Sequence, residues 1–143
     1  EITTLLIPGE NDSDQEIDAM TKWVASHLGP DVPHHFSAFH PAWKMMDKPE
    51  TPAGTVIRAR DIARANGLRH VYTGNIHDNT GGGSTSCAGC GAPLIERDWY
   101  ELGRWRLTAD GRCPDCGTAL PGVFEAEPGD WGRKRLPVRL GLA

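Results

Sequence analysis

The sequence has 143 residues, of which 24% are charged and 38% hydrophobic, and its formal net charge is −4. This composition predicts a soluble globular protein with one ordinary core, and the acidic balance argues against a general nucleic-acid-binding surface. No apolar run approaches the roughly 18 residues that a membrane helix needs. No signal peptide is visible, so the expected location is the cytoplasm.

Strand and helix patterns alternate in the first part of the sequence. Residues 2–7 are apolar and β-branched, which predicts a buried strand. Ser13 and Glu16 form a capping box before a helix whose apolar residues recur at helical spacing until Gly29. A second strand is predicted over 34–40, and it ends in polar residues before a proline.

A second helix is predicted over 51–67 and a third strand over 69–72. The order β-α-β-α-β implies parallel strands. Three such strands cannot close a barrel, and two helices cannot cover both faces of an open sheet. The sheet is therefore expected to continue with strands on its N-terminal side.

The composition changes after residue 78. A run of glycine, serine and threonine over 80–85 is typical of a flexible joint. Short strands are expected at three places beyond it: 94–97, 99–107 and 119–124. The sequence is thus divided into three parts: an α/β domain over 1–78, a small metal-binding β subdomain over 79–126 and a C-terminal tail over 127–143.

The four cysteines form two matching Cys-x-x-Cys-Gly motifs: Cys87, Cys90, Cys113 and Cys116. Two intervening residues let both thiolates of a pair reach one ion, and the glycine suits the tight turn. This spacing favours a metal over disulfides. Four thiolates leave no open position for water, which indicates a structural site. Zinc is the expected metal, while iron in a rubredoxin-like electron-transfer site would have the same ligands.

The cysteine-rich segment does not have the charge of a nucleic-acid-binding ribbon. Residues 81–126 contain four arginines and six acidic residues, a balance of −2. Without a basic groove, Trp99, Tyr100 and Trp105 are expected to pack in the core or at an interface. A non-enzymatic ribbon that binds a protein partner therefore remains one hypothesis for the function.

Several segments, in the same order along the chain, resemble one protein family. They are 6–12 (LIPGEND), 33–41 (PHHFSAFHP), 71–78 (VYTGNIHD), 87–97 (CAGCGAPLIER) and 113–122 (CPDCGTALPG). Together they resemble the C-terminal part of radical S-adenosylmethionine (SAM) proteins related to pyruvate formate-lyase activating enzymes. The most similar branch is the AmmeMemoRadiSam type, which carries a C-terminal four-cysteine ribbon.

The resemblance implies that the intact protein is a partial (β/α) barrel that binds SAM. A 4Fe-4S (iron–sulfur) cluster, held by an N-terminal Cys-x-x-x-Cys-x-x-Cys motif, would cleave SAM reductively to give a 5′-deoxyadenosyl radical. That motif is absent from this sequence. The chain alone is therefore expected to hold no cluster, to have no catalytic residue of its own and to be inactive.

The resemblance also implies roles for residues at the strand ends. His40 would lie close to SAM, and the adenine side would be lined by Leu6, Ile7 and Pro8. The rim that faces an unidentified substrate would include Asn75, His77 and Asp78. His77 and Asp78 are also consistent with a hydrogen-bonded pair that fixes a loop.

Overall fold

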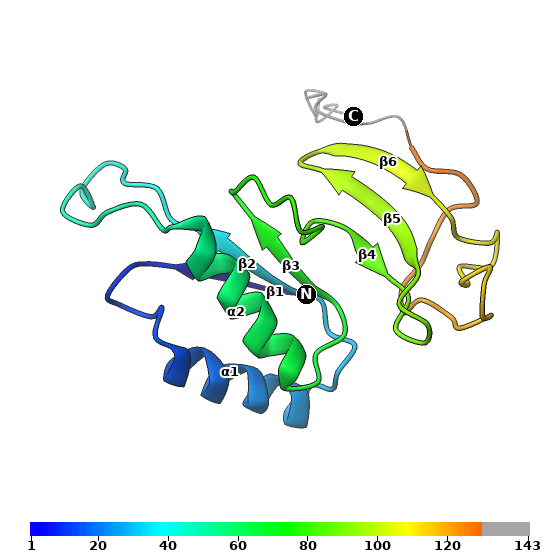
Figure 1. Ribbon diagram of the computed structural model, residues 1–143, viewed down its shortest axis with the longest axis horizontal. Helices are drawn as coiled ribbons and strands as arrows, with labels where there is room; N and C mark the ends of the chain where they lie inside the picture. The colour runs from blue at the N-terminus through cyan, green and yellow to red at the C-terminus, as the bar shows by residue number, and fades with distance from the viewer. Residues whose placement is uncertain (130–143) are drawn as a thin grey trace, which may run out of the picture.

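The computed structural model describes residues 1–129 as two small β-sheets, one of them covered by two helices (Figure 1). The elements are β1 (Ile2–Leu6), α1 (Asp14–His27), β2 (His34–Ala38), α2 (Ala53–Ala65), β3 (Val71–Gly74), β4 (Thr85–Ser86), β5 (Pro93–Asp98) and β6 (Glu101–Trp105). Strands β1, β2 and β3 form a parallel sheet in that order, and β4, β5 and β6 form an antiparallel sheet. The α/β fold expected from the sequence is confirmed, and no barrel is present in the described residues.

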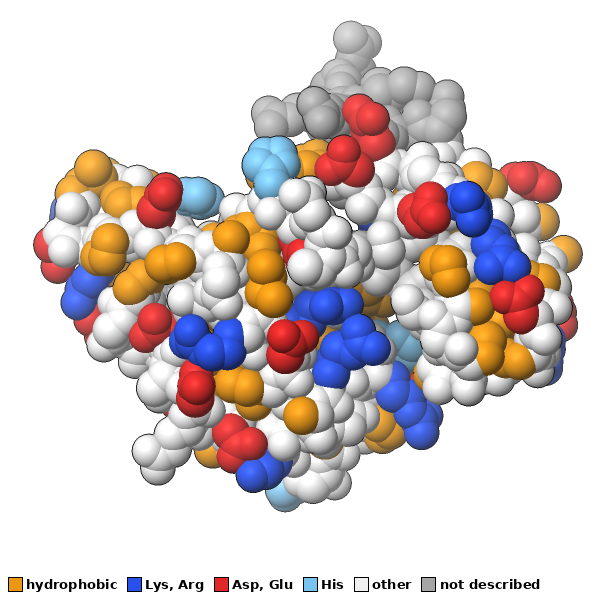
Figure 2. Space-filling view, in the orientation of Figure 1, with side chains coloured by type: hydrophobic (Ala, Val, Ile, Leu, Met, Phe, Trp, Pro, Cys, Tyr) orange, Lys and Arg blue, Asp and Glu red, His pale blue; other side chains and the backbone are white. Residues whose placement is uncertain are grey.

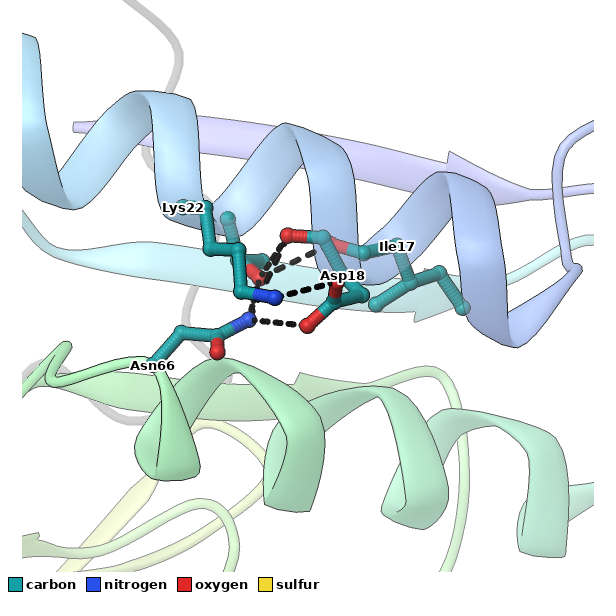
Figure 3. Close-up of polar contacts among 5 residues, drawn as sticks. Ile17, Asp18, Lys22 and Asn66 are labelled. Carbon is teal, nitrogen blue, oxygen red and sulfur yellow. Dashed lines mark hydrogen bonds and ion pairs between the residues drawn. The ribbon is translucent and has the colours of Figure 1, made fainter.

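The capping box predicted at the start of α1 is confirmed. Ser13 is the N-cap, and its hydroxyl accepts a hydrogen bond from the N–H of Glu16 at 3.3 Å. Asn66, which follows α2, donates its amide to the carboxylate of Asp18 and the hydroxyl of Thr21, both within α1 (Figure 3). These contacts hold α1 and α2 side by side on the sheet.

Both helices cover the same face of the parallel sheet (Figure 1). The core between the helices and the sheet includes the fully buried side chains of Leu6, Phe36 and Val56. Side chains alternate along a strand, so the intervening residues point to the opposite face. On β1 this opposite face carries Leu5, of which 43% is exposed.

Two adjacent histidines occupy opposite faces of β2, as the alternation of a strand requires. His34 is fully buried on the helix side, where its ring stacks on Phe36 and its Nε2 lies 3.0 Å from the hydroxyl of Thr4. His35 is half-buried on the other face, where its ring stacks on Tyr72. His34 is therefore a packing residue, and His35 remains accessible to a ligand.

We expect stability to fall as the pH falls through the window set by His34. Burial lowers its pKa from 6.5 to about 4, so the folded protein keeps the ring neutral while the unfolded chain protonates it. The contribution of the neutral His34 ring to the free energy of unfolding is complete above about pH 6.5 and is lost as the pH falls to about 4. Burial lowers the pKa of His70 in the same direction. Urea unfolding across this window measures the effect.

The matched variants for this prediction are His34→Gln and His27→Gln. His27 is exposed on α1. We expect His34→Gln to flatten the pH dependence and His27→Gln to leave it unchanged. A wild-type stability that stays constant over the whole window would contradict the account.

Two expectations about local structure are wrong, and a third concerns residues that the structure does not describe in full. The third strand is Val71–Gly74 and not 69–72. The backbone N–H of Arg69 donates to the carbonyl of Pro30, outside the sheet, and the pairing with β2 starts at Val71. Residues 119–124 form only an isolated bridge, between Ala119 and Arg112. The tail expected over 127–143 lies outside the described residues from 130 onward.

The glycine-rich run over 80–85 is a packed turn rather than a flexible joint. The N–H of Thr73 donates to the carbonyl of Gly82 at 3.1 Å, and a Cβ on Gly82 would lie 2.0 Å from Oδ2 of Asp78. Thr85 is buried and already belongs to β4. The run therefore holds the antiparallel sheet against β3.

Among residues 1–129, no helix is both long enough and apolar enough to cross a membrane.

Candidate metal centre and adjoining cavity

The four cysteines come together from two turns of the small subdomain. Cys87 and Cys90 lie between β4 and β5, whereas Cys113 and Cys116 lie beyond β6. Their Sγ atoms all fall within 4.8 Å of one another, and across the two turns Cys87 lies 3.5 Å from Cys116 and Cys90 lies 3.7 Å from Cys113. Tetrahedral zinc with bonds of about 2.3 Å separates its sulfurs by about 3.8 Å. The cysteines therefore form a group that could hold one metal ion such as zinc or iron.

The two cysteine turns have the same backbone hydrogen bonds. In each turn, the N–H of the glycine after the second cysteine donates to the carbonyl of the first at 2.9 Å: Gly91 to Cys87 and Gly117 to Cys113. Both glycines have a positive φ, +75° and +73°, which favours glycine. The two turns are thus equivalent supports for the four thiols.

The protonation of the thiols depends on their mutual contact. A side-chain hydrogen bond between Cys116 and Thr118 is the main cause that lowers the pKa of Cys116 to about 6. The backbone N–H of Ala92 lowers the pKa of Cys90, but the neighbouring thiols outweigh it and raise that pKa to about 12. Four thiolates at this separation repel one another strongly, so full ionisation needs a bound cation.

One residue at the cysteine site, Thr118, lies outside the two Cys-x-x-Cys-Gly motifs. A Cβ on Gly89 would lie 2.3 Å from Oγ1 of Thr118, so the first cysteine turn packs directly against the second. Thr118 also stands two residues after Cys116, the same spacing as Ala92 after Cys90. An alignment of the two cysteine motifs with each other could therefore have identified Thr118 from the sequence.

The carboxyl ends of the parallel strands bring other predicted residues to one edge. His40 is exposed after β2, with Nε2 3.4 Å from the carbonyl of Asn75 and Nδ1 3.5 Å from the carboxylate of Glu50. Thr51, which was not predicted as a site residue, connects the end of β1 with the segment after β2 at this edge through hydrogen bonds. Its hydroxyl donates to the carbonyl of Leu6 at 2.5 Å and accepts from the N–H of Phe39 at 3.0 Å.

The residues expected near the adenine of SAM differ in accessibility. The side chain of Leu6 is fully buried in the core under the helices, so only its backbone is at the edge. Ile7 and Pro8 continue from it and are half-buried. The N–H of Ile7 donates to Oδ1 of Asn11 at 2.8 Å, which fixes the turn after β1.

The residues expected at the substrate rim follow β3 in one loop. Asn75 has a φ of +59° and donates its amide to the carbonyl of Ala38 at 3.3 Å. Asp78 accepts from the hydroxyls of Thr73 and Thr80, and these bonds lower its pKa against the opposing effect of burial. The alternative of a bonded His77–Asp78 pair is wrong, because Nδ1 of His77 instead accepts from the indole of Trp99 at 3.4 Å.

A cavity of about 670 Å³ lies between the open face of the parallel sheet and the antiparallel sheet. Its walls include His35 and Tyr72 from the parallel sheet, and Thr85 and Arg97 from the antiparallel sheet. Asn75, His77 and Asp78 also line it, whereas His40, Leu6, Ile7 and Pro8 do not. No sequence pattern predicted this cavity, because the cavity depends on the packing of one sheet against the other.

The surface charge is mixed on the face that Figure 2 presents, where basic side chains alternate with acidic ones. On the antiparallel sheet and its cysteine turns, three arginines form ion pairs with acidic side chains: Arg104 with Glu96, Arg106 with Asp115 and Arg112 with Asp110. Neutralised arginines do not provide the basic groove that a nucleic-acid backbone needs.

Comparison with known proteins identifies a relative in an archaeon. The chain is 39% identical over 121 residues to a protein of Methanocaldococcus jannaschii that is described only as uncharacterized. The match covers 84% of this chain and 36% of that protein, so the chain spans about a third of the length of the relative it matches. No protein-family model and no solved structure matches the chain.

Proposed function

We propose that this chain is the C-terminal part of a radical SAM protein of the activating-enzyme type, in which it supplies barrel strands and a structural zinc ribbon. The observation that carries the proposal is the arrangement of the parallel sheet. Both helices lie on one face, and the other face carries the polar residues His35 and Ser37. An open α/β sheet has helices on both faces, whereas a barrel has them only on the outside.

The relative supports the proposal by its length. The matched region is 36% of that protein, which leaves ample chain for further barrel strands and for a cluster-binding motif. All four cysteines of the present chain belong to the two cysteine turns. Reductive cleavage of SAM at an iron–sulfur cluster would thus be a property of the intact protein.

The carboxyl ends of barrel strands are where such folds place their sites. We assign His40, together with Ile7, Pro8 and the backbone of Leu6, to the SAM side of that site. His40 is suited to this role because its ring is exposed at the strand edge. Asn75, His77 and Asp78 would form the rim that faces the substrate, since they line the cavity beside the same edge.

The test uses the intact protein, purified without oxygen. We expect iron–sulfur absorbance and, on reduction, formation of 5′-deoxyadenosine from SAM, whereas the present chain alone forms none. In the intact protein, His40→Ala should weaken SAM binding and the exposed control His27→Ala should not. Absence of iron–sulfur absorbance in the intact protein would refute the proposal.

A second candidate function is that of a protein-binding ribbon. It is favoured by the hairpin of β5 and β6, where Trp99, Tyr100 and Leu102 are 45%, 68% and 41% exposed. Aromatic side chains of this kind are enriched at protein interfaces. An intact protein that lacks the cluster but associates with a partner through this hairpin would favour the second function over the first.

A further inference from the structure

The cavity between the two sheets contains a cationic group, Arg97, that has no acidic partner in the described part of the chain. Arg97, at the end of β5, donates from Nη1 to the hydroxyl of Thr85 at 2.8 Å. Within residues 1–129 it forms no ion pair, in contrast to Arg104, Arg106 and Arg112 on the same sheet and its cysteine turns. An arginine has five N–H donors, and the exposed guanidinium of Arg97 directs one of them to a side chain among the described residues, which leaves the others available to a ligand.

Hydroxyl groups beside Arg97 extend the same donor set. Thr85 is buried, and its Oγ1 lies 2.9 Å from the hydroxyl of Tyr72 across the gap between the two sheets. When the Thr85 hydroxyl donates to Tyr72, the phenolic proton of Tyr72 is free to face the cavity. Arg97 and Tyr72 can thus donate to the same acceptor from opposite walls.

The acidic groups that line the cavity are Glu1, Asp78 and Asp98. Asp78 is engaged by its own loop through Thr73 and Thr80. Glu1 lies beside the ring of His35, with 3.6 Å between Oε1 and Nε2. None of the three lies within ion-pairing distance of Arg97 among the described residues.

The geometry points to the binding of an oxyanion, a carboxylate or phosphate group of a small molecule, between Arg97 and Tyr72. A guanidinium forms paired hydrogen bonds with either group. A volume of about 670 Å³ is in the range of small-molecule sites. The rings of His35, Tyr72 and Trp99 on the cavity walls offer flat surfaces to the remainder of the ligand. This inference does not depend on the proposed radical SAM function.

The experiment is an NMR titration of the full chain with sodium phosphate and, separately, with sodium acetate, each at an ionic strength matched with sodium chloride. We expect the backbone resonances of Tyr72, Thr85 and Arg97 to shift with at least one probe. The probe that binds tells whether the natural group is a phosphate or a carboxylate. Shifts with neither probe overturn the proposal.

Three variants make the test specific. Arg97→Gln should weaken binding at least about tenfold, because hydrogen bonds to a charged group are lost. Tyr72→Phe keeps the ring against His35 and should weaken binding by about fivefold through the loss of one hydroxyl donor. Arg104→Gln removes an exposed arginine that is paired with Glu96 and should change nothing.

Folding of the variants is checked by their circular dichroism and metal content. Because Arg97→Gln also removes the bond to Thr85, Arg97→Lys, which keeps the charge, serves as a second variant and should retain part of the affinity. Equal affinity in the wild type, Arg97→Gln and Tyr72→Phe would show that the anion binds elsewhere and would overturn the proposal.

Discussion

Substitution of Cys113 by serine should abolish metal binding and unfold the antiparallel sheet. Cys113 is 1% exposed and belongs to a small core whose other buried members are Cys87, Leu94, Ile95, Leu107 and Leu120, with Ala92, Trp105 and Phe124 packed partly buried against it. So small a cluster cannot replace the roughly 10–16 kcal/mol that a structural zinc site supplies. We expect zinc content to fall to background and the methyl resonances of Leu94 and Ile95 to lose their dispersion.

The matched control for Cys113→Ser is Asp115→Ser, an exposed substitution within the same cysteine turn. It should keep the metal and lose only the surface ion pair with Arg106, which contributes at most about 1 kcal/mol. A Cys113→Ser protein that retained one tightly bound metal, or whose antiparallel sheet stayed folded without it, would contradict the structural role.

Phe36→Ala should give the second large effect, this time confined to the α/β part. Phe36 is fully buried on the central strand β2, between the helices and the sheet. Removal of a buried phenylalanine ring costs about 3–5 kcal/mol through lost burial and the cavity that remains. Urea unfolding, followed by the circular dichroism of α1 and α2, should show this loss.

The control for Phe36→Ala is Leu102→Ala, which trims an apolar side chain that is 41% exposed on β6. Its effect should stay within about 0.5 kcal/mol, as is usual for surface positions. Phe36 belongs to a different core from the cysteines, so Phe36→Ala should leave the metal content unchanged. Loss of the metal in Phe36→Ala would show that the two cores fold as one unit.

The cysteine site could be predicted from the sequence because its determinants are local. A Cys-x-x-Cys-Gly motif specifies its own turn, as the matching hydrogen bonds of Gly91 and Gly117 show. The helix start at Ser13 was predictable for the same reason, since a cap and its partner are three residues apart.

The features that the sequence did not reveal depend on distant contacts. The turn over 80–85 has the composition of a flexible segment, but Asp78 and Thr73 bind it to β3. The cavity is lined by Tyr72 and Arg97 from separate sheets, and hydrophobic periodicity does not predict which residues of two sheets lie close together. Leu6 was assigned to a ligand by its place at a strand end, whereas the alternation of β1 directs its side chain into the core.

The most direct test of the account is the metal content of this chain, measured by elemental mass spectrometry together with its visible spectrum. A closed set of four thiolates that serves only to hold the fold predicts about one zinc per chain and a colourless protein. A folded chain with no metal and four titratable thiols would contradict the central claim. A coloured chain with about one iron would instead identify a rubredoxin-like centre and replace the structural role with electron transfer.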